Sequence, residues 1–384
     1  MTYSSYLTDM QRTLKDQNTI SPKASEHTPV NADAFRKSLL AWYDKHQRIL
    51  PWRAKGKGKT NPYYTWLSEI MLQQTTVQAV IPYFLSFIER WPTVQDLASA
   101  DDDDVMSAWA GLGYYARARN LLKCARTIAT TPYNGHFPDN IQDLEKLPGI
   151  GPYTAAAICA IAFNKEANVV DGNIERVISR VFAIQIPLPE SKKIIRNKAA
   201  ILTDGCSDRP GDYAQAMMDL GATICVPSNP KCDICPVNKH CEGYVKKVAN
   251  DLPKKSRKQK IPTRKGQVFW ISNQKGQILI EKRDDHRMLG GMTGLPGSTW
   301  DIKQTPAELP KALEKYFNGL IPYKTHKKAV RHTFSHFHLA LDIVMIDNAD
   351  NKAPAGYNWA DRKSITHLGF PTLFKKVVNF VQAL

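Results

Sequence analysis

The sequence predicts a multidomain protein in which an all-α core is followed by a smaller α+β domain. At 384 residues, the chain exceeds the roughly 250–300 residues at which single hydrophobic cores stop growing, so two or three domains are expected. Apolar residues recur with helical spacing from Asp33 to about Tyr244, and strand patterns are scarce there. Beyond a basic segment, alternating and β-branched runs predict strands.

The helical part follows a polar segment, residues 1–32, which lacks hydrophobic periodicity and is expected to be a flexible tail. A run of four acidic residues, Asp101 to Asp104, opens the third helix, where the helix dipole favours negative charge, so a capped and solvated first turn is expected. The predicted helices cover residues 35–46, 64–91 (broken by Pro82), 101–112 and 114–130.

The second half begins with a basic linker, residues 246–265. It carries nine Lys or Arg against one acidic residue, and we expect it to lie near phosphate groups. Residues 266–384 form the predicted α+β domain. Its expected strands are residues 266–272, 276–283 and 336–347, and its expected helices are 307–317 and 371–384.

The net charge of +16 and the pI of about 9.4 predict a polyanionic partner, DNA or RNA, rather than an anionic membrane, because no basic amphipathic anchor is present. A basic surface that serves only solubility is the alternative. No apolar run approaches the ~18–20 residues of a membrane span, and the N-terminus lacks a signal-peptide pattern. We therefore expect a cytoplasmic protein.

Four of the seven cysteines crowd into one short segment with the spacing C-x6-C-x2-C-x5-C. Four thiolates this close can converge on tetrahedral zinc or on an iron–sulfur cluster. Zinc sites more often pair two C-x2-C turns, so the single one favours a cluster with a structural role. Cys124 and Cys159 fall on helical patterns and are expected in the core. The predicted ligands are Cys225, Cys232, Cys235 and Cys241.

The stretch "LPGIG", residues 147–151, predicts a tight turn between two helices. Backbone amides at Gly149 and Gly151 could grip a phosphate at the start of the next helix, while Ile150 enters the core. Alone, the pattern is equally an ordinary helix end and turn.

Two acidic residues stand out near this turn. Asp171 in "VVDGNIERV" precedes a helix and could be only an N-cap. Glu69 lies at the edge of the apolar stripe of its helix, where desolvation should raise its pKa, although a salt-bridged Glu fits the pattern as well. A protonated acid beside an ionised Asp is the arrangement that cleavage of a glycosidic bond requires.

Together these features resemble the helix-hairpin-helix DNA glycosylases of the endonuclease III superfamily. Narrower motifs are "LPWR", "WLSEIMLQQT", "GLGYYARARNL", "AMMDLGA" and "RHTFSHFHL". They resemble those of the MutY-type adenine DNA glycosylases within that superfamily. The resemblance covers about Asp33 to the end of the chain. It implies a cluster lobe of residues 33–55 and 164–245, and a six-helix barrel lobe of residues 56–163.

The resemblance implies a DNA repair enzyme that removes adenine mispaired with 8-oxoguanine or guanine, with one [4Fe-4S] cluster and double-stranded DNA as partner. It implies that adenine is flipped out of the duplex and that the protein acts as a nucleoid-associated monomer. Glu69 would protonate adenine N7, and Asp171 would stabilise the oxocarbenium ion. Tyr153 stands where related lyases carry the Schiff-base lysine, which implies hydrolysis by water.

Further roles follow from the same resemblance. Gln74 would fill the space left by adenine, with Tyr114 nearby. Residues Phe334, Ser335 and His336 match a loop that recognises 8-oxoguanine; from the sequence alone, this segment reads as a strand with outward histidines. The residues matching an adenine pocket are Trp52, Arg53, Asn173 and Gln215.

The C-terminal domain resembles Nudix domains through "MLGGMTGLPGSTW". The carboxylates with which catalytic Nudix folds hold Mg²⁺ are missing, so pyrophosphate hydrolysis is not expected. Thr293 and Leu295 stand where relatives often carry aromatic residues. Three alternatives stay open here: a bifunctional glycosylase/lyase, a Nudix-type nucleotide pyrophosphatase, and a non-catalytic DNA-binding or redox protein.

Overall fold

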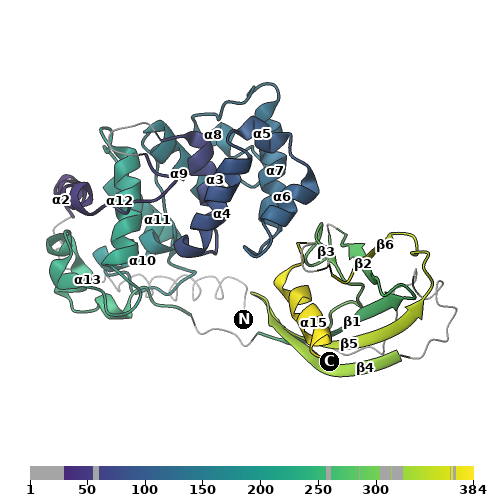
Figure 1. Cartoon of the computed structure of the whole chain (residues 1–384). Coiled ribbons are helices and arrows are strands. Elements are labelled where there is room, and N and C mark those ends of the chain that lie inside the picture. Colours follow the sequence, from purple (N-terminus) through teal and green to yellow (C-terminus); the bar gives the residue numbers. More distant parts are fainter. Residues whose placement is uncertain are drawn as a thin grey trace, which may run out of the picture.

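A helical half and a sheet-containing half make up the chain (Figure 1). The computed structural model describes residues 30–54, 60–256, 261–284, 286–302, 313, 323–363, 365 and 369–384. Except for residues 30–32, the predicted tail lies outside the described residues, and so does the predicted helix 307–317 except for Leu313. No described helix is long and apolar enough to cross a membrane.

The described residues before Thr263 contain helices and no strands, which confirms the predicted all-α character of this part. Side-chain N-caps begin most of the first helices; Asn61, for example, accepts a bond from the backbone N–H of Tyr63 at 2.9 Å. The α-helices are α2 (Ala32–His46), α3 (Pro62–Leu72), α4 (Val77–Arg90), α5 (Val94–Ala98), α6 (Asp102–Ala108), α7 (Ala116–Ala129), α8 (Ile141–Leu144), α9 (Pro152–Phe163), α10 (Gly172–Val181), α11 (Lys192–Thr203), α12 (Pro210–Thr223) and α13 (Glu242–Val245). The 3₁₀ turns are η1 (Cys232–Ile234), η2 (Asn238–His240) and η3 (Ala249–Asp251).

The long helix predicted for residues 64–91 is two helices, and the predicted break at Pro82 is wrong. Pro82 lies inside α4, whereas the chain breaks between α3 and α4. Gln74 there takes a left-handed backbone conformation with φ 59°, and Thr76 caps α4 by accepting a bond from Ala79 N–H. The first helix therefore stops before Gln74, and the second begins after the N-cap Thr76. This capping bond marks the helix boundary, whereas Pro82 is accommodated inside α4.

Helix α3 runs through the middle of the helical core. Its residues from Thr65 to Met71 are all buried, and so are those of the alanine-rich α9 from Thr154 to Ala160. Small side chains let the backbones approach closely: a Cβ on Gly211 of α12 would lie 2.6 Å from the carbonyl oxygen of Ala160. A side chain that points inward from α3 is therefore largely shielded from solvent.

The C-terminal half is a mixed sheet with the strand order β3-β2-β1-β5-β4, in which β6 also pairs with β2. Strands β1 and β5 are parallel, and the other pairs are antiparallel. The apolar face of α15 packs against the sheet through Phe374 and its neighbours (Figure 1). The elements are β1 (Thr263–Asn273), β2 (Ile278–Lys282), β3 (Thr293–Gly294), β4 (Tyr323–Thr333), β5 (His338–Ala349), β6 (Tyr357–Ala360) and α15 (Thr372–Gln382).

The segment predicted as a linker is partly anchored on the helical half. Backbone N–H of Leu188 donates to the carbonyl of Lys254 at 2.8 Å, and Ser256 N–H donates back to Leu188 at 3.2 Å. Strand β1 begins at Thr263, within the predicted linker. The described part of the basic segment before residue 257 is therefore anchored on the helical half, and its last residues begin the sheet.

The two halves also contact each other through side chains. Lys282 Nζ lies 2.5 Å from the Asp103 carboxylate, and the Arg119 guanidinium donates to the carbonyl of Gly290. Leu289 packs against the cores of both halves. The acidic first turn of α6 caps its helix as predicted, through Asp101, and also forms part of this contact.

Candidate active site

The core position of α3 buries Glu69, whose side chain points into the helical half with a residue exposure of 6%. Its pKa is raised to about 7, mainly by burial and to a smaller extent by the nearby charge of Asp171. The Tyr153 hydroxyl donates to Glu69 Oε2 at 2.7 Å and opposes that rise. The predicted elevation of the Glu69 pKa is confirmed, and its main cause is desolvation.

Asp171 is the N-cap of α10, and one carboxylate oxygen accepts the backbone N–H of Ile174 at 2.7 Å. Its other oxygen accepts the side-chain amide of Asn173 at 2.9 Å. Burial raises the pKa of Asp171, and these hydrogen bonds oppose the rise. The capping role does not exclude a chemical role, because the same carboxylate lies close enough to Glu69 to influence its charge.

Glu69 forms part of the wall of a cavity between α3, α9 and α12. The structure brings three of the predicted adenine-pocket residues to this cavity, namely Trp52, Arg53 and Gln215. Asn173 is not among its lining residues, and its amide instead bonds Asp171. Apolar side chains supply much of the rest of the wall: Leu50, Leu72, Val77, Ile161 and Met218.

Asp219 organises one side of the cavity and was missed by the sequence analysis, although it lies in the quoted motif "AMMDLGA". It is fully buried and accepts two bonds from Arg53, at 2.7 and 2.8 Å, and two from Arg48. Burial raises the pKa of Asp219, but the hydrogen bonds and charges of the two arginines outweigh that effect and lower it overall. An acidic residue inside an apolar helix pattern was the available signal.

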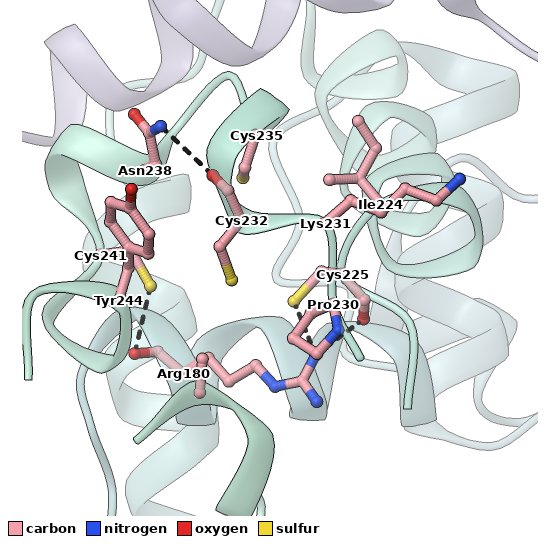
Figure 2. Close-up of a pocket in the computed structure, with 11 residues that line it drawn as sticks. Arg180, Ile224, Cys225, Pro230, Lys231, Cys232, Cys235, Asn238, Cys241 and Tyr244 are labelled. Carbon is pink, nitrogen blue, oxygen red and sulfur yellow. Dashed lines mark hydrogen bonds between the residues drawn. The ribbon is translucent and has the colours of Figure 1, made fainter. Parts of the chain in front are cut away.

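The four predicted cysteine ligands line one cavity, and Figure 2 shows their side chains converging on it. Burial raises the pKa of Cys235 to about 12 and that of Cys241 to about 11, so their thiolates need a nearby positive charge. Among the described residues no set of three His, Cys, Asp or Glu is placed to hold a metal ion. Four thiols around one cavity are the donor set of tetrahedral zinc or of an iron–sulfur cluster.

A continuous set of hydrogen bonds connects Asp171 with the cysteine loop. Asn173 bonds Asp171, Arg176 donates to the Asn173 side-chain oxygen at 2.9 Å, and Arg176 Nε donates to the carbonyl of Cys225 at 2.7 Å. Arg180, one turn further along α10, donates to the Cys225 sulfur at 3.2 Å (Figure 2). Folding of the loop therefore supports the helix that presents Asp171.

The glycine turn has the geometry that its sequence predicts. Gly149 has φ +76°, and a Cβ there would lie 2.8 Å from Asn120 Cβ, so both backbone and space favour glycine. Ile150 is buried, as predicted, whereas Gly151 is exposed at the N-terminus of α9. Cys124 and Cys159 are buried in the core, as predicted.

The predicted lesion loop is a turn between β4 and β5, not a continuous strand with outward histidines. Phe334 stacks on Trp300 with ring centroids 5.7 Å apart, and His336 is exposed. The hydroxyls of Ser335 and Tyr114 share a hydrogen bond of 2.8 Å across the two halves. Leu295, where an aromatic residue was noted as missing, is fully buried and belongs to the core.

The chain is similar to known proteins over most of its length. It is 33% identical to the adenine DNA glycosylase of Homo sapiens, with 91% of this chain and 74% of the relative covered. Its identity to the adenine DNA glycosylase of Mus musculus is 34%, over 95% of this chain and 81% of the relative. Its identity to that of Buchnera aphidicola subsp. Schizaphis graminum is 35%, over 90% of this chain and 98% of the relative. The chain belongs to the adenine DNA glycosylase family. Three family models match parts of it: the HhH-GPD superfamily base excision DNA repair protein at residues 67–202, the iron-sulfur binding domain of endonuclease III at 225–241, and the NUDIX domain at 267–380.

This adenine DNA glycosylase therefore binds damaged DNA and acts in base-excision repair. Its four-cysteine loop is an iron–sulfur binding domain. The Nudix-like fold of the C-terminal half agrees with its mixed sheet and the packed α15.

Proposed function

We propose that this adenine DNA glycosylase excises adenine paired with 8-oxoguanine or guanine by hydrolysing the N-glycosidic bond with water. Glu69 is the general acid, and Asp171 stabilises the oxocarbenium ion. The observation that carries this proposal is the buried Glu69, with a pKa of about 7, beside Asp171 and on the wall of a cavity that also contains Arg53 and Gln215. At neutral pH, such a carboxyl group is protonated in a large fraction of molecules and can act as an acid.

The reaction begins when adenine enters the cavity and Glu69 transfers its proton to adenine N7. The bond between C1′ and N9 then breaks, and its electron pair leaves with the base. The sugar becomes an oxocarbenium ion, whose positive charge the half-buried Asp171 carboxylate stabilises at short range. Water adds to C1′, and the Glu69 carboxylate accepts the released proton, which restores the enzyme.

Tyr153 favours this hydrolytic course over a lyase reaction. Burial raises its pKa well above the ordinary value, and the charge of Glu69 adds to the rise, so the side chain stays a neutral phenol. A phenol cannot form a Schiff base with the sugar, whereas lysine can. The donated bond instead orients Glu69 and keeps its acidity near neutral pH.

The remaining predicted residues supply DNA contacts. We assign the amides around Gly149 and Gly151 to phosphate binding, and Gln74 and Tyr114 to insertion into the base stack. The exposed loop of Phe334, Ser335 and His336 reads 8-oxoguanine. The cluster is a single [4Fe-4S] centre that supports the lobe of residues 33–55 and 164–245, opposite the barrel of residues 56–163. The enzyme acts as a monomer on the cytoplasmic nucleoid.

Single-turnover excision on four duplexes that differ only in the base opposite adenine (8-oxoguanine, G, C or T) tests the proposal. We expect cleavage of the first two and little of the others, and equal rates on all four would refute mispair specificity. Glu69→Gln and Asp171→Asn should abolish base release while DNA binding survives. Borohydride trapping on abasic DNA should give little covalent complex, and efficient trapping would support a lyase instead.

A further inference from the structure

Arg117 is a buried cation that joins three segments of the helical half. It lies in the first turn of α7, and its side chain reaches the C-terminal end of α3. Nη1 donates to the carbonyls of Ile70 and Met71 at 2.8 and 2.9 Å. Nη2 donates to the carbonyls of Leu112 and Gly113 and to the Thr75 hydroxyl, each at 3.2 Å.

This position is electrostatically unfavourable for a cation, for two reasons. The N-terminus of a helix carries partial positive charge, which repels an arginine in the first turn of α7. Burial also lowers the pKa of Arg117 to about 10, although the group still carries its proton at neutral pH. The partial negative charge on the last carbonyls of α3 and the five hydrogen bonds offset these costs.

Each of the joined segments carries a residue of the proposed reaction. The helix whose end Arg117 holds carries Glu69, one residue before Ile70. The Thr75 hydroxyl lies next to Gln74, and the Arg117 guanidinium lies over the ring of Tyr114, 5.5 Å from its centroid. No active-site cavity residue lies among these contacts, so Arg117 itself does not touch the base.

The two DNA-contacting residues share an unusual backbone conformation. Gln74 has φ 59° and Tyr114 has φ 49°, in the left-handed region that non-glycine residues rarely adopt. Such conformations cost free energy and persist only where the surrounding structure fixes them. Arg117 bonds both loops at once, to Thr75 on one side and to Gly113 on the other.

We propose that Arg117 is a positioning residue that holds Gln74 and Tyr114 at a fixed separation from each other and from the end of the catalytic helix. Insertion of the two side chains into the duplex and delivery of adenine to Glu69 then form one concerted step. This inference rests on the proposed roles of Gln74 and Tyr114. Without Arg117, the loops relax independently, and adenine is flipped less often, although the acid and its cavity are intact.

The decisive variants are at Thr75, because they leave the buried guanidinium and its four carbonyl partners in place. Thr75→Val removes the hydroxyl that accepts the Arg117 bond, and Thr75→Ser keeps it. Thr127→Val is the matched control: it is half-buried on the other end of α7, and its hydroxyl bonds only the helix carbonyl of Lys123. Arg117→Lys keeps a charge but cannot bond five acceptors.

Base flipping by the holoenzyme of each variant is measured with 2-aminopurine placed opposite 8-oxoguanine in the position of adenine. The fluorescence of 2-aminopurine rises when it leaves the base stack. Excision of adenine is measured separately under single-turnover conditions. Loss of one hydrogen bond to a charged group predicts a drop on the order of tenfold in flipping and excision for Thr75→Val. Thr75→Ser and Thr127→Val should match the parent. The visible absorbance of the cluster should stay unchanged in all Thr variants, and the thermal midpoint of each should stay well above the assay temperature.

If Thr75→Val flips and excises adenine as Thr127→Val does, the positioning role is wrong. The same conclusion follows if Thr75→Ser is as impaired as Thr75→Val, because the hydroxyl would then be irrelevant. Arg117→Lys should be more impaired than Thr75→Val, and parental activity in it would also overturn the inference. Failure of the proposed function itself is distinguished by the parent enzyme, which would then show no excision of adenine opposite 8-oxoguanine.

Discussion

Because Glu69 is buried, we expect ionisation of its carboxyl group at neutral and alkaline pH to lower the free energy of unfolding. Glu69→Gln replaces the carboxyl group with a neutral amide of the same shape. The pKa of Glu69 is raised in the folded protein from the ordinary 4.5 to about 7. At about 1.36 kcal/mol for each pKa unit, ionising this group inside the fold costs on the order of 3 kcal/mol of unfolding free energy.

The sign of the pH dependence follows from the raised value. The folded protein binds the Glu69 proton more tightly than the unfolded chain does, so this contribution to stability is complete below pH ~4.5 and is lost as pH rises through about 7. The Gln variant never ionises and escapes the loss. It should be more stable than the parent by about 1 kcal/mol at pH 5.5 and by about 3 kcal/mol at pH 8.5, while excision is abolished.

Urea unfolding followed by tryptophan fluorescence at several pH values between these limits measures the difference. Exposed Glu145→Gln is the matched control and should leave the unfolding free energy within about 0.5 kcal/mol of the parent. A Glu69→Gln advantage that is constant with pH, or that shrinks as pH rises, would refute the assignment of Glu69 as a desolvated acid.

Three other substitutions test the surrounding structure. Tyr153→Phe removes the bond that lowers the Glu69 pKa, so the alkaline fall of the excision rate should move upward by about one pH unit in a rate–pH profile; a downward move would contradict the geometry. Asp219→Asn leaves the nearly buried Arg53 and the half-buried Arg48 without their anion and should cost about 3–5 kcal/mol in urea unfolding, whereas a cost under about 1 kcal/mol would show that they find other partners. Asp103→Lys should loosen the contact between the halves, which faster proteolysis between them and a larger radius of gyration would detect. Adding Lys282→Asp to the same chain should restore the parental values, and a failure to restore them would mean that the ion pair is incidental.

Local patterns were enough to predict most of the fold. Apolar periodicity predicted α2, α7 and α15, and β-branched runs predicted β1 and β5. The break at Pro82 was wrong, because periodicity continues across residues 73–76 and only the capping hydrogen bond of Thr76 shows where α4 begins.

Part of the candidate site was predictable for the same reason. The cysteine spacing, the glycine turn and an acidic residue at the edge of an apolar stripe are local features, and they pointed to the four thiols, Gly149 and Glu69. Asp219 and Arg117 were missed, because the sequence pattern places each of these charged residues in a helix but does not show which distant groups hydrogen-bond it in the fold. Their partners are distant in the chain, as with Arg117 and Ile70, which are 47 residues apart.

The sequence by itself therefore determined the two-part architecture, the cluster loop, the glycine turn and the residue types available for glycosidic chemistry. Only the tertiary structure decided the electrostatics. The buried position of α3 sets the pKa of Glu69, the phenol of Tyr153 is brought onto its carboxylate, and Tyr114 meets Ser335 across the two halves. Desolvation and hydrogen bonding depend on every atom packed around a group, and those atoms come from segments that the linear order of the chain keeps apart.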